Sequence, residues 1–217
     1  MVTPIESSPP PGWDRQGVDL VLSALPPGQL SEIVGPRSSG ATSLLLALLA
    51  RTTAAGSLAA LVDATDALDP AAAAAAGADL GALLWVRCGG RLDSALRAAD
   101  LLARCPGFAV VGLDLGDLPA ESRSSIPPAK WLRLQRAIKG SQTILVVRAP
   151  HHLAGPVAAL VLSARKLRAR WIGLPRPSRL GGLLSEVRVL RARHAFCPLL
   201  RGRGHGEAGQ IAIVWEP

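Results

Sequence analysis

The chain of 217 residues alternates short apolar runs with segments whose apolar residues recur at helical spacing. Apolar runs bounded by Gly, Pro or Asp are typical of buried strands, and apolar residues three or four positions apart are typical of helices. The pattern predicts strands over 30–34, 57–62, 83–87, 108–113 and 143–147, and helices over 44–50, 70–76, 94–104 and 128–139. Strands that alternate with helices indicate right-handed crossovers and a mainly parallel sheet.

Three residues mark the expected helix ends. Pro70 stands where helices favour proline, at the first helical position, and Gly77 is a natural stop for the alanine run that follows Pro70. Asp93 is expected to cap the helix over 94–104. The alanine run is therefore interpreted as a short helix rather than as a low-complexity tract.

The pattern changes after Pro150. Four apolar segments, 157–163, 167–172, 186–193 and 211–215, read as strands joined by loops without helices between them. They predict an antiparallel extension of the same sheet. Residues 1–16 are rich in Pro and Ser and are expected to form a flexible arm, which leaves 17–217 as one core domain.

Composition excludes several classes of protein. Hydrophobic residues make up 49% of the chain, with few aromatics and no Tyr, which suits helices packed closely on a parallel sheet. No apolar run approaches the ~20 residues that cross a bilayer, and the N-terminus lacks the features of a signal peptide. The three cysteines have no metal-ligand spacing. We therefore expect a cytoplasmic protein without membrane contact.

Charge is divided unevenly along the chain. Residues 1–120 carry 7 basic and 12 acidic side chains, a net charge of −5, whereas residues 121–217 carry 17 basic and 4 acidic ones, a net charge of +13. A basic half of this size attracts polyanions through counterion release. Two interpretations stay open, contact with nucleic acid or a merely solubilising surface, because the basic half has few aromatic residues for base stacking.

The segment 35–43, with the sequence GPRSSGATS, follows a predicted strand and opens a predicted helix. The phosphate-binding motif G-x-x-x-x-G-K-[ST] requires this context, but Ala41 occupies the lysine position. In such a loop, backbone N–H groups hold the phosphates and the lysine neutralises charge on the transferring phosphoryl group. Its loss removes a charge-assisted hydrogen bond of about 1.5–3 kcal/mol. The sequence therefore predicts a phosphate loop without efficient ATP hydrolysis.

Several segments together resemble the core of the bacterial recombinase RecA. The loop at 35–42 resembles the family's G-P-E-S-S-G-K-T, and 60–70, ALVDATDALDP, resembles its F-I-D-A-E-H-A-L-D-P stretch. Residues 109–114 occupy the place of the Walker B strand, and 133–149 resemble the helix and strand before the nucleotide-sensing Asn-Gln pair. The resemblance is collinear from about Gly17 to the C-terminus. It implies an α/β fold, a RecA-like P-loop core whose mainly parallel twisted sheet is flanked by helices and extended by antiparallel C-terminal strands.

The departures from the family pattern fall on its ATPase residues. Ala41 replaces the lysine, Thr65 stands where the family has the glutamate that activates the attacking water, and Arg148 with Ala149 replaces the Asn-Gln pair. Cation, general base and sensor are thus altered together. The resemblance then implies a protein that is not an enzyme.

Three outcomes are considered for the altered loop: no nucleotide, nucleotide binding without turnover, and residual hydrolysis. No cofactor is expected; the open alternative is weak binding of ATP and Mg²⁺ through Thr42 and Asp114, with Arg37 as a substitute cation. The alternative is that the loop binds no ligand and only connects the strand tightly to the helix. The resemblance places the degenerate nucleotide site on Gly35, Ser38, Ser39, Gly40, Thr42 and Asp114.

Other candidate chemistry is limited. Asp63, like Asp114, ends a predicted strand, where α/β sites form, and His151 with His152 is interpreted as a solvated pair in a turn. Alternation along a strand predicts that Lys166, Arg168 and Arg170 share one face. The candidate nucleic-acid-binding residues are Lys166, Arg168, Arg170, Arg191 and Arg193.

A RecA-like chain without ATPase residues resembles the ImuA group, bacterial RecA relatives that accompany the polymerase homologue ImuB in damage-induced (SOS) translesion synthesis. The resemblance implies an accessory protein of the DNA damage response that binds RecA, the ImuB-like polymerase homologue, or DNA. The alternative is a regulator of recombination that binds DNA or nucleotide directly through the basic C-terminal half.

Overall fold

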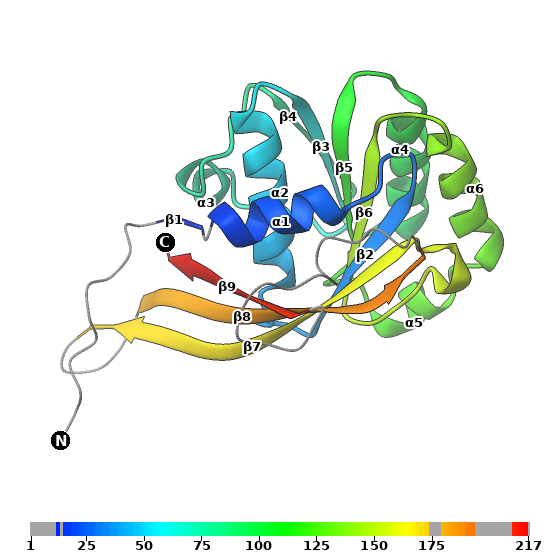
Figure 1. Cartoon of the computed structure of the whole chain (residues 1–217). Coiled ribbons are helices and arrows are strands. Elements are labelled where there is room, and N and C mark those ends of the chain that lie inside the picture. The colour runs from blue at the N-terminus through cyan, green and yellow to red at the C-terminus, as the bar shows by residue number, and fades with distance from the viewer. Residues whose placement is uncertain (1–11, 14, 174–178, 194–209, 217) are drawn as a thin grey trace.

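The computed structural model describes residues 12–13, 15–173, 179–193 and 210–216. Within these ranges the chain forms a nine-stranded sheet with the order β1-β9-β8-β7-β2-β6-β5-β3-β4 (Figure 1). The strands are β1 (Gly12–Trp13), β2 (Leu30–Val34), β3 (Leu58–Asp63), β4 (Leu83–Arg87), β5 (Phe108–Asp114), β6 (Ile144–Ala149), β7 (Leu160–Ile172), β8 (Arg179–Ala192) and β9 (Gln210–Glu216).

Strands β2 to β7 form the parallel part of the sheet, as the sequence predicts. β2 pairs parallel with β6 and β7, β5 pairs parallel with β3 and β6, and β4 pairs parallel with β3 at the edge. β2 is buried over its whole length and β3 over all but its first residue. Strands that are covered on both faces read as continuous apolar runs, and for this reason the sequence reveals them clearly.

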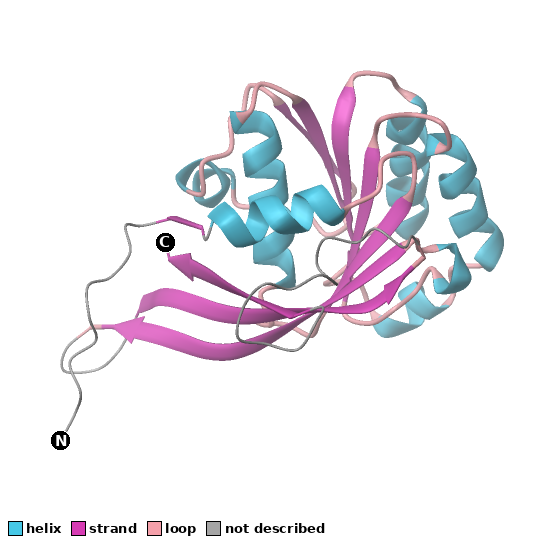
Figure 2. Cartoon of the chain, in the orientation of Figure 1, coloured by secondary structure: helices cyan, strands magenta, loops and turns pink. Residues whose placement is uncertain are grey.

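Helices cover both faces of the parallel strands (Figure 2). One core joins α1 and α2 to the strand side chains that include Ile33 and Leu61, and the other joins α4 and α6 to side chains that include Val62 and Leu113. The helices are α1 (Arg15–Ala24), α2 (Ala41–Ala54), α3 (Pro70–Ala75), α4 (Leu92–Arg104), α5 (Ala120–Ser124) and α6 (Pro128–Ile138), with a 3₁₀ turn η1 (Gly155–Val157).

The last strands form the predicted antiparallel extension. β7 pairs antiparallel with β8, β8 with β9, and β9 with β1. The prediction of separate strands over 157–163 and 167–172 is wrong, because residues 164–166 also pair with β8 and join both segments into one strand. β8 likewise begins earlier than predicted, at Arg179.

Two local predictions need correction. The expected flexible arm, 1–16, lies mostly outside the described residues, but its last part is ordered as β1 and the start of α1. Asp93 is not a helix cap: α4 begins one residue before it, and its carboxylate lies 3.8 Å from the ammonium group of Lys130. An acidic residue in the first turn still favours the helix through the macrodipole. Neither α1 nor α5 is predicted by the apolar pattern of the sequence.

Asp100 links α4 to α6 and supplies a pH-dependent contribution to stability. Its side chain is 8% exposed and accepts hydrogen bonds from Arg133 (2.8 Å) and Arg104 (3.1 Å). The hydrogen bond from Arg133 is the main cause that lowers the pKa of Asp100 to about 2. The unfolded value is about 3.9, so this stabilisation is present above pH 4 and is lost as the pH falls towards 2.

Replacing Asp100 with Asn is expected to lower the free energy of unfolding by about 1–2 kcal/mol at pH 7, because the charge that both arginines contact is lost. The loss is modest since the arginine partners are exposed and screened by solvent. The difference from the unmodified protein should shrink between pH 4 and pH 2. Urea denaturation at both ends of this range measures it. A difference that does not change with pH would contradict the assignment.

The described residues contain no helix long and apolar enough to cross a lipid bilayer.

Candidate phosphate-loop site

The loop at 35–43 connects the end of β2 to the start of α2. Gly40 is the N-cap of α2 and has a φ of +93°, a conformation that favours glycine. A Cβ atom on Gly40 would lie 2.2 Å from Oγ of Ser185 on β8, so that a side chain has no room there. The glycine is therefore required both by the backbone and by the packing of β8 against the loop.

One hydrogen bond to β6 and one within the loop hold the loop in place. The N–H of Gly35 donates to the carbonyl oxygen of Ala149 (3.0 Å), which ties the loop to the end of β6. The buried Oγ of Ser39 accepts from the N–H of Ala41 (3.2 Å). The scaffold of a phosphate loop is therefore intact although Ala41 provides no cation.

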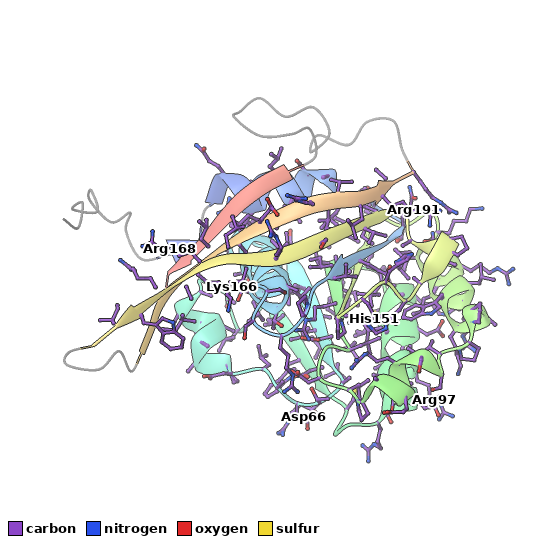
Figure 3. The ribbon with its side chains drawn as sticks, turned by 90° about the horizontal axis from the view of Figure 1, so that it is seen from below. Asp66, Arg97, His151, Lys166, Arg168 and Arg191 are labelled. Atoms are coloured by element: carbon purple, nitrogen blue, oxygen red, sulfur yellow. The ribbon has the colours of Figure 1, made fainter. Side chains whose placement is uncertain are left out.

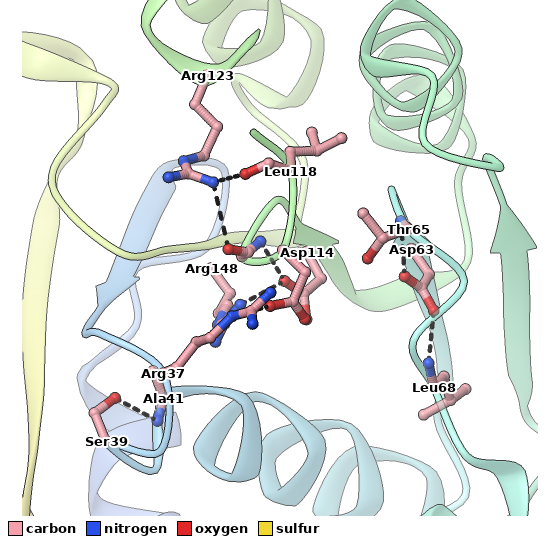
Figure 4. Close-up of polar contacts among 12 residues, drawn as sticks. Arg37, Ser39, Ala41, Asp63, Thr65, Leu68, Asp114, Leu118, Arg123 and Arg148 are labelled. Carbon is pink, nitrogen blue, oxygen red and sulfur yellow. Dashed lines mark hydrogen bonds and ion pairs between the residues drawn. The ribbon is translucent and has the colours of Figure 1, made fainter. Parts of the chain in front are cut away.

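The principal polar contact at the base of the site joins Arg148 on β6 to Asp114 at the end of β5 (Figure 4). Nη1 of Arg148 lies 3.3 Å from Oδ1 of Asp114, and the two side chains are only 5% and 15% exposed. A Cβ atom on Gly116 would lie 0.8 Å from Nη1 of Arg148. The guanidinium group therefore fills the space that a side chain at position 116 would need.

Opposing effects act on the Asp114 carboxyl. Burial raises its pKa above the usual range, while the charge of Arg148 and the N–H of Gly116, which donates to it at 2.8 Å, act in the opposite direction. A Mg²⁺ ion bound to Asp114 would lie beside the guanidinium group, and like charges repel. The groups around Asp114 therefore do not fit a metal ion, and the described residues contain no cluster of three or more His, Cys, Asp or Glu.

Two further arginines hold the segment after β5. Arg123 of α5 is buried, and its Nη1 donates to the carbonyl oxygens of Leu118 and Gly116. Arg37, considered above as a substitute cation, instead pairs with Asp117 at 3.0 Å and is 80% exposed. Because Asp117 already holds it, Arg37 provides no charge inside the site.

The carboxylate of Asp63 has a structural role. It is 2% exposed and accepts hydrogen bonds from the N–H groups of Thr65 (3.2 Å) and Leu68 (2.8 Å) and from Nε1 of Trp85 (3.2 Å). These bonds fix the chain just after β3 (Figure 4). Asp63 is thus fully engaged at the strand end, and Thr65 brings no carboxylate to the site.

A cavity of about 280 Å³ lies between the loop and the strands β7 and β8. Its lining includes four of the six residues predicted around the loop, namely Ser38, Ser39, Gly40 and Thr42. Asp114 is not part of the lining, but its partner Arg148 is. Gly35 lies beneath the loop, and a Cβ on it would meet Oγ of Ser39 at 2.4 Å. A larger cavity, of about 680 Å³, lies at the amino ends of β2 and β6. Ligand sites of parallel sheets lie at the carboxyl ends, so the smaller cavity is the candidate site.

The basic residues predicted on one face of β7 lie on two faces. Lys166 is opposite Ser185 and Arg168 is opposite Leu184, with a bulge between them. Paired residues share a face and neighbours alternate, so Lys166 and Arg168 point to opposite faces. The prediction of a single stripe is therefore wrong for Lys166, which lines the cavity at the loop. Figure 3 labels Lys166 and Arg168 along β7. The bulge, which the sequence does not signal, is the cause.

The register places five arginines on the outer face of β7 and β8, the face that α2 does not cover: Arg165, Arg168, Arg170, Arg188 and Arg191. Most of them have partners. Arg165 and Arg188 pair with the buried Glu186 at 3.1 Å and 2.9 Å, and Arg170 and Arg191 donate to backbone carbonyl oxygens. Arg193, also predicted to bind nucleic acid, lies apart from this face and lines the larger cavity.

Glu32 is a buried polar residue that the sequence did not single out. It lies in the middle of β2, is fully buried, and accepts hydrogen bonds from the N–H groups of Leu153 and Ala154, both at 2.9 Å. Its second oxygen contacts Nδ1 of His152. The loop after β6 is thus fixed to the central strand. Both histidines are exposed, as predicted, but the contact of the His152 ring with Glu32 was not foreseen. A carboxylate inside an apolar strand is the only signal that the sequence offers.

Comparison with known proteins agrees with this geometry. Residues 13–117 match the RecA N-terminal domain. The RecA protein of Synechocystis sp. is 35% identical over 159 residues, which cover 70% of this chain and 43% of the relative. The RecA protein of Clavibacter michiganensis is 41% identical over 105 residues, which cover 48% of this chain and 29% of the relative. The chain thus spans less than half the length of these relatives.

The solved structure of the RadB recombinase is similar in fold, with a TM-score of 0.56 and 18% identity over 87% of both chains. Together with the matches to RecA, this similarity confirms the predicted RecA-like recombinase core with its mainly parallel sheet.

Proposed function

We propose that this RecA-like core acts in DNA recombination and repair without hydrolysing ATP, as an accessory protein that works by binding other proteins. The relationship to RecA supports a role in DNA recombination and repair. The absence of the loop lysine at Ala41 and of a carboxylate at Thr65 supports the loss of catalysis. Catalysis of phosphoryl transfer depends on cations and a positioned water, and both replacements remove such groups.

The observation that carries the proposal is the buried ion pair between Arg148 and Asp114. A Walker B aspartate serves ATP hydrolysis by helping to hold Mg²⁺, and here its charge is used inside the protein. Breaking the pair to admit a metal would leave a buried guanidinium group without its counter-charge, which is strongly unfavourable. The pair therefore favours a core that is stable without nucleotide.

The more specific proposal is a role like that of the ImuA group, as an accessory factor in translesion synthesis during the DNA damage response. The candidate partners are RecA and an ImuB-like polymerase homologue. A core that keeps one face of a filament-forming protein, but not its ATP-driven cycle, is suited to a single stable contact.

The test combines binding and turnover. The purified protein is immobilised and exposed, at low and high salt, to RecA or to the ImuB-like homologue, and ATP hydrolysis is measured with and without single-stranded DNA. We expect salt-resistant retention of at least one partner and hydrolysis at background. Retention of neither partner would refute the accessory role, and clear DNA-stimulated hydrolysis would refute the loss of ATPase activity.

A second candidate function is direct DNA binding, and the outer face of β7 and β8 favours it. Arg168 is exposed on this face and has no ion pair or hydrogen bond among the described residues, and Arg165 and Arg188 are 65% and 49% exposed. Glu186 neutralises part of this charge: burial acts to raise its pKa, but the hydrogen bonds from Arg188 and Arg165 outweigh that effect and lower it.

This candidate predicts salt-sensitive binding of single-stranded DNA that weakens when Arg165 and Arg168 are replaced by Gln. Each lost phosphate contact should reduce the salt dependence by about one unit of slope. Replacement of Lys139, an exposed lysine on a different surface, is the control. If the protein does not bind single-stranded DNA even at low salt, direct DNA binding is excluded as its function.

A further inference from the structure

The cavity between the phosphate loop and β7–β8 has a cationic lining. Arg148 from β6 and Lys166 from β7 both line it, and among the described residues of its wall there is no carboxylate. The remaining wall is formed by the loop on one side and by apolar side chains that include Trp171 and Leu183 on the other. Because Asp114 compensates the charge of Arg148, Lys166 supplies the uncompensated positive charge, and a charge in a partly enclosed cavity attracts an anion more strongly than the same charge on an open surface.

Lys166 is directed to the loop by the register of β7 and β8. It pairs with Ser185, whose Oγ lies against Gly40 of the loop, and both residues therefore face the loop side of the sheet. Within the described part of the chain, Lys166 makes no ion pair or hydrogen bond, in contrast to Arg37, which Asp117 holds outside the cavity. The free cation of this site therefore comes from β7 and not from the loop.

Hydrogen-bond donors without partners lie at the start of α2, beside the cavity. The N–H groups of Gly40, Thr42 and Ser43 have no partner among the described residues, as is usual at a helix start. Independently of the loop, Nε of Arg148 and Oγ of Ser185 are buried and have no partner among those residues either. Buried donors without partners are rare in proteins. Of these two side chains, Arg148 lines the cavity, so an acceptor bound there would lie beside its guanidinium group.

We propose that Lys166, Arg148 and the loop N–H groups bind a phosphate-type oxyanion, and that they do so without a divalent cation. Lys166 takes the part of the missing loop lysine from another strand, and Arg148 keeps the metal away through its pair with Asp114. The volume of about 280 Å³ lies below the ~300–1,000 Å³ of sites for larger ligands, so the cavity suits a phosphate or pyrophosphate group. This binding goes beyond the proposed function, which does not require any ligand.

The experiment measures the binding of inorganic phosphate, pyrophosphate and ATP to the full chain by calorimetry, once in EDTA and once with Mg²⁺. Pyrophosphate is expected to bind in EDTA, and Mg²⁺ should not strengthen binding. Lys166→Ala is expected to weaken pyrophosphate binding about tenfold or more, because a charge-assisted hydrogen bond is lost. Arg168→Ala is the matched control, since it removes a positive charge from the same strand on the opposite face, and should change binding by no more than about twofold.

Binding of phosphate and pyrophosphate together with ATP would identify the oxyanion itself as the ligand. Binding of ATP alone, or binding only with Mg²⁺, would overturn the proposal in favour of an ordinary nucleotide site. Equal losses in Lys166→Ala and Arg168→Ala would show a general charge effect and would also overturn it, as would the failure of all three anions to bind. Such a failure leaves the proposed function intact, because only ATP turnover or the absence of partners contradicts that function.

Discussion

Replacing Arg148 with Ala is expected to lower the free energy of unfolding by about 3–5 kcal/mol at pH 7. The substitution leaves the Asp114 carboxylate without its counter-charge in a site where it is only 15% exposed. It also opens the space against Gly116 that the guanidinium group fills. Chemical denaturation monitored by circular dichroism measures the loss.

The same variant should show a distinct pH dependence. Without Arg148, burial raises the pKa of Asp114 further above its usual range, since the main opposing charge is gone. A carboxyl group with a raised pKa stabilises the fold below the unfolded value of about 3.9 and loses that contribution as the pH rises. The deficit of the variant should therefore be smaller near pH 4 than at pH 8.

Arg37→Ala is the matched control for this experiment. It also removes an arginine that pairs with an aspartate near the loop, but its side chain is 80% exposed. Exposed pairs contribute about 0–1 kcal/mol, so the control should lose no more than that. Equal losses in the two variants would contradict the structural importance of the buried pair.

Restoring the loop lysine by Ala41→Lys is expected to leave ATP turnover at background. Electrostatic groups and general bases contribute roughly 10²–10³ and 10²–10⁴ to rates, and the substitution returns only one of them. Thr65 still supplies no carboxylate, and Arg148 still occupies Asp114. A coupled assay with Mg²⁺ and single-stranded DNA, run against a no-protein blank, measures turnover.

A combined variant defines which step is missing. Ala41→Lys together with Thr65→Glu and Arg148→Asn returns a cation and a carboxylate and frees Asp114, so that Mg²⁺-dependent ATP binding should return before any turnover. Circular dichroism of each variant confirms that it is folded. A rise in turnover of more than about tenfold from Ala41→Lys alone would refute the view that three changes act together.

The sequence determined the parallel core because its strands are covered on both faces. Such strands read as uninterrupted apolar runs, and their helices carry local start and stop signals such as Pro70 and Gly77. Gly77 has a φ of +91°, and α3 begins at Pro70, as expected. Prediction was poorer in the long antiparallel strands, where most residues of β7 after Ala164 are exposed and bulges shift the register.

Sequence alone also identified the loop, its missing lysine and the three altered positions, since these are statements about residue types at fixed spacing. Only the tertiary structure decided which charges meet there. It pairs Arg148 with Asp114 across two neighbouring strands, sends Arg37 outward to Asp117, and turns Lys166 towards the loop through a bulge in β7. The direction of a side chain depends on register and packing between segments far apart in the chain, and these are fixed only when the sheet is assembled.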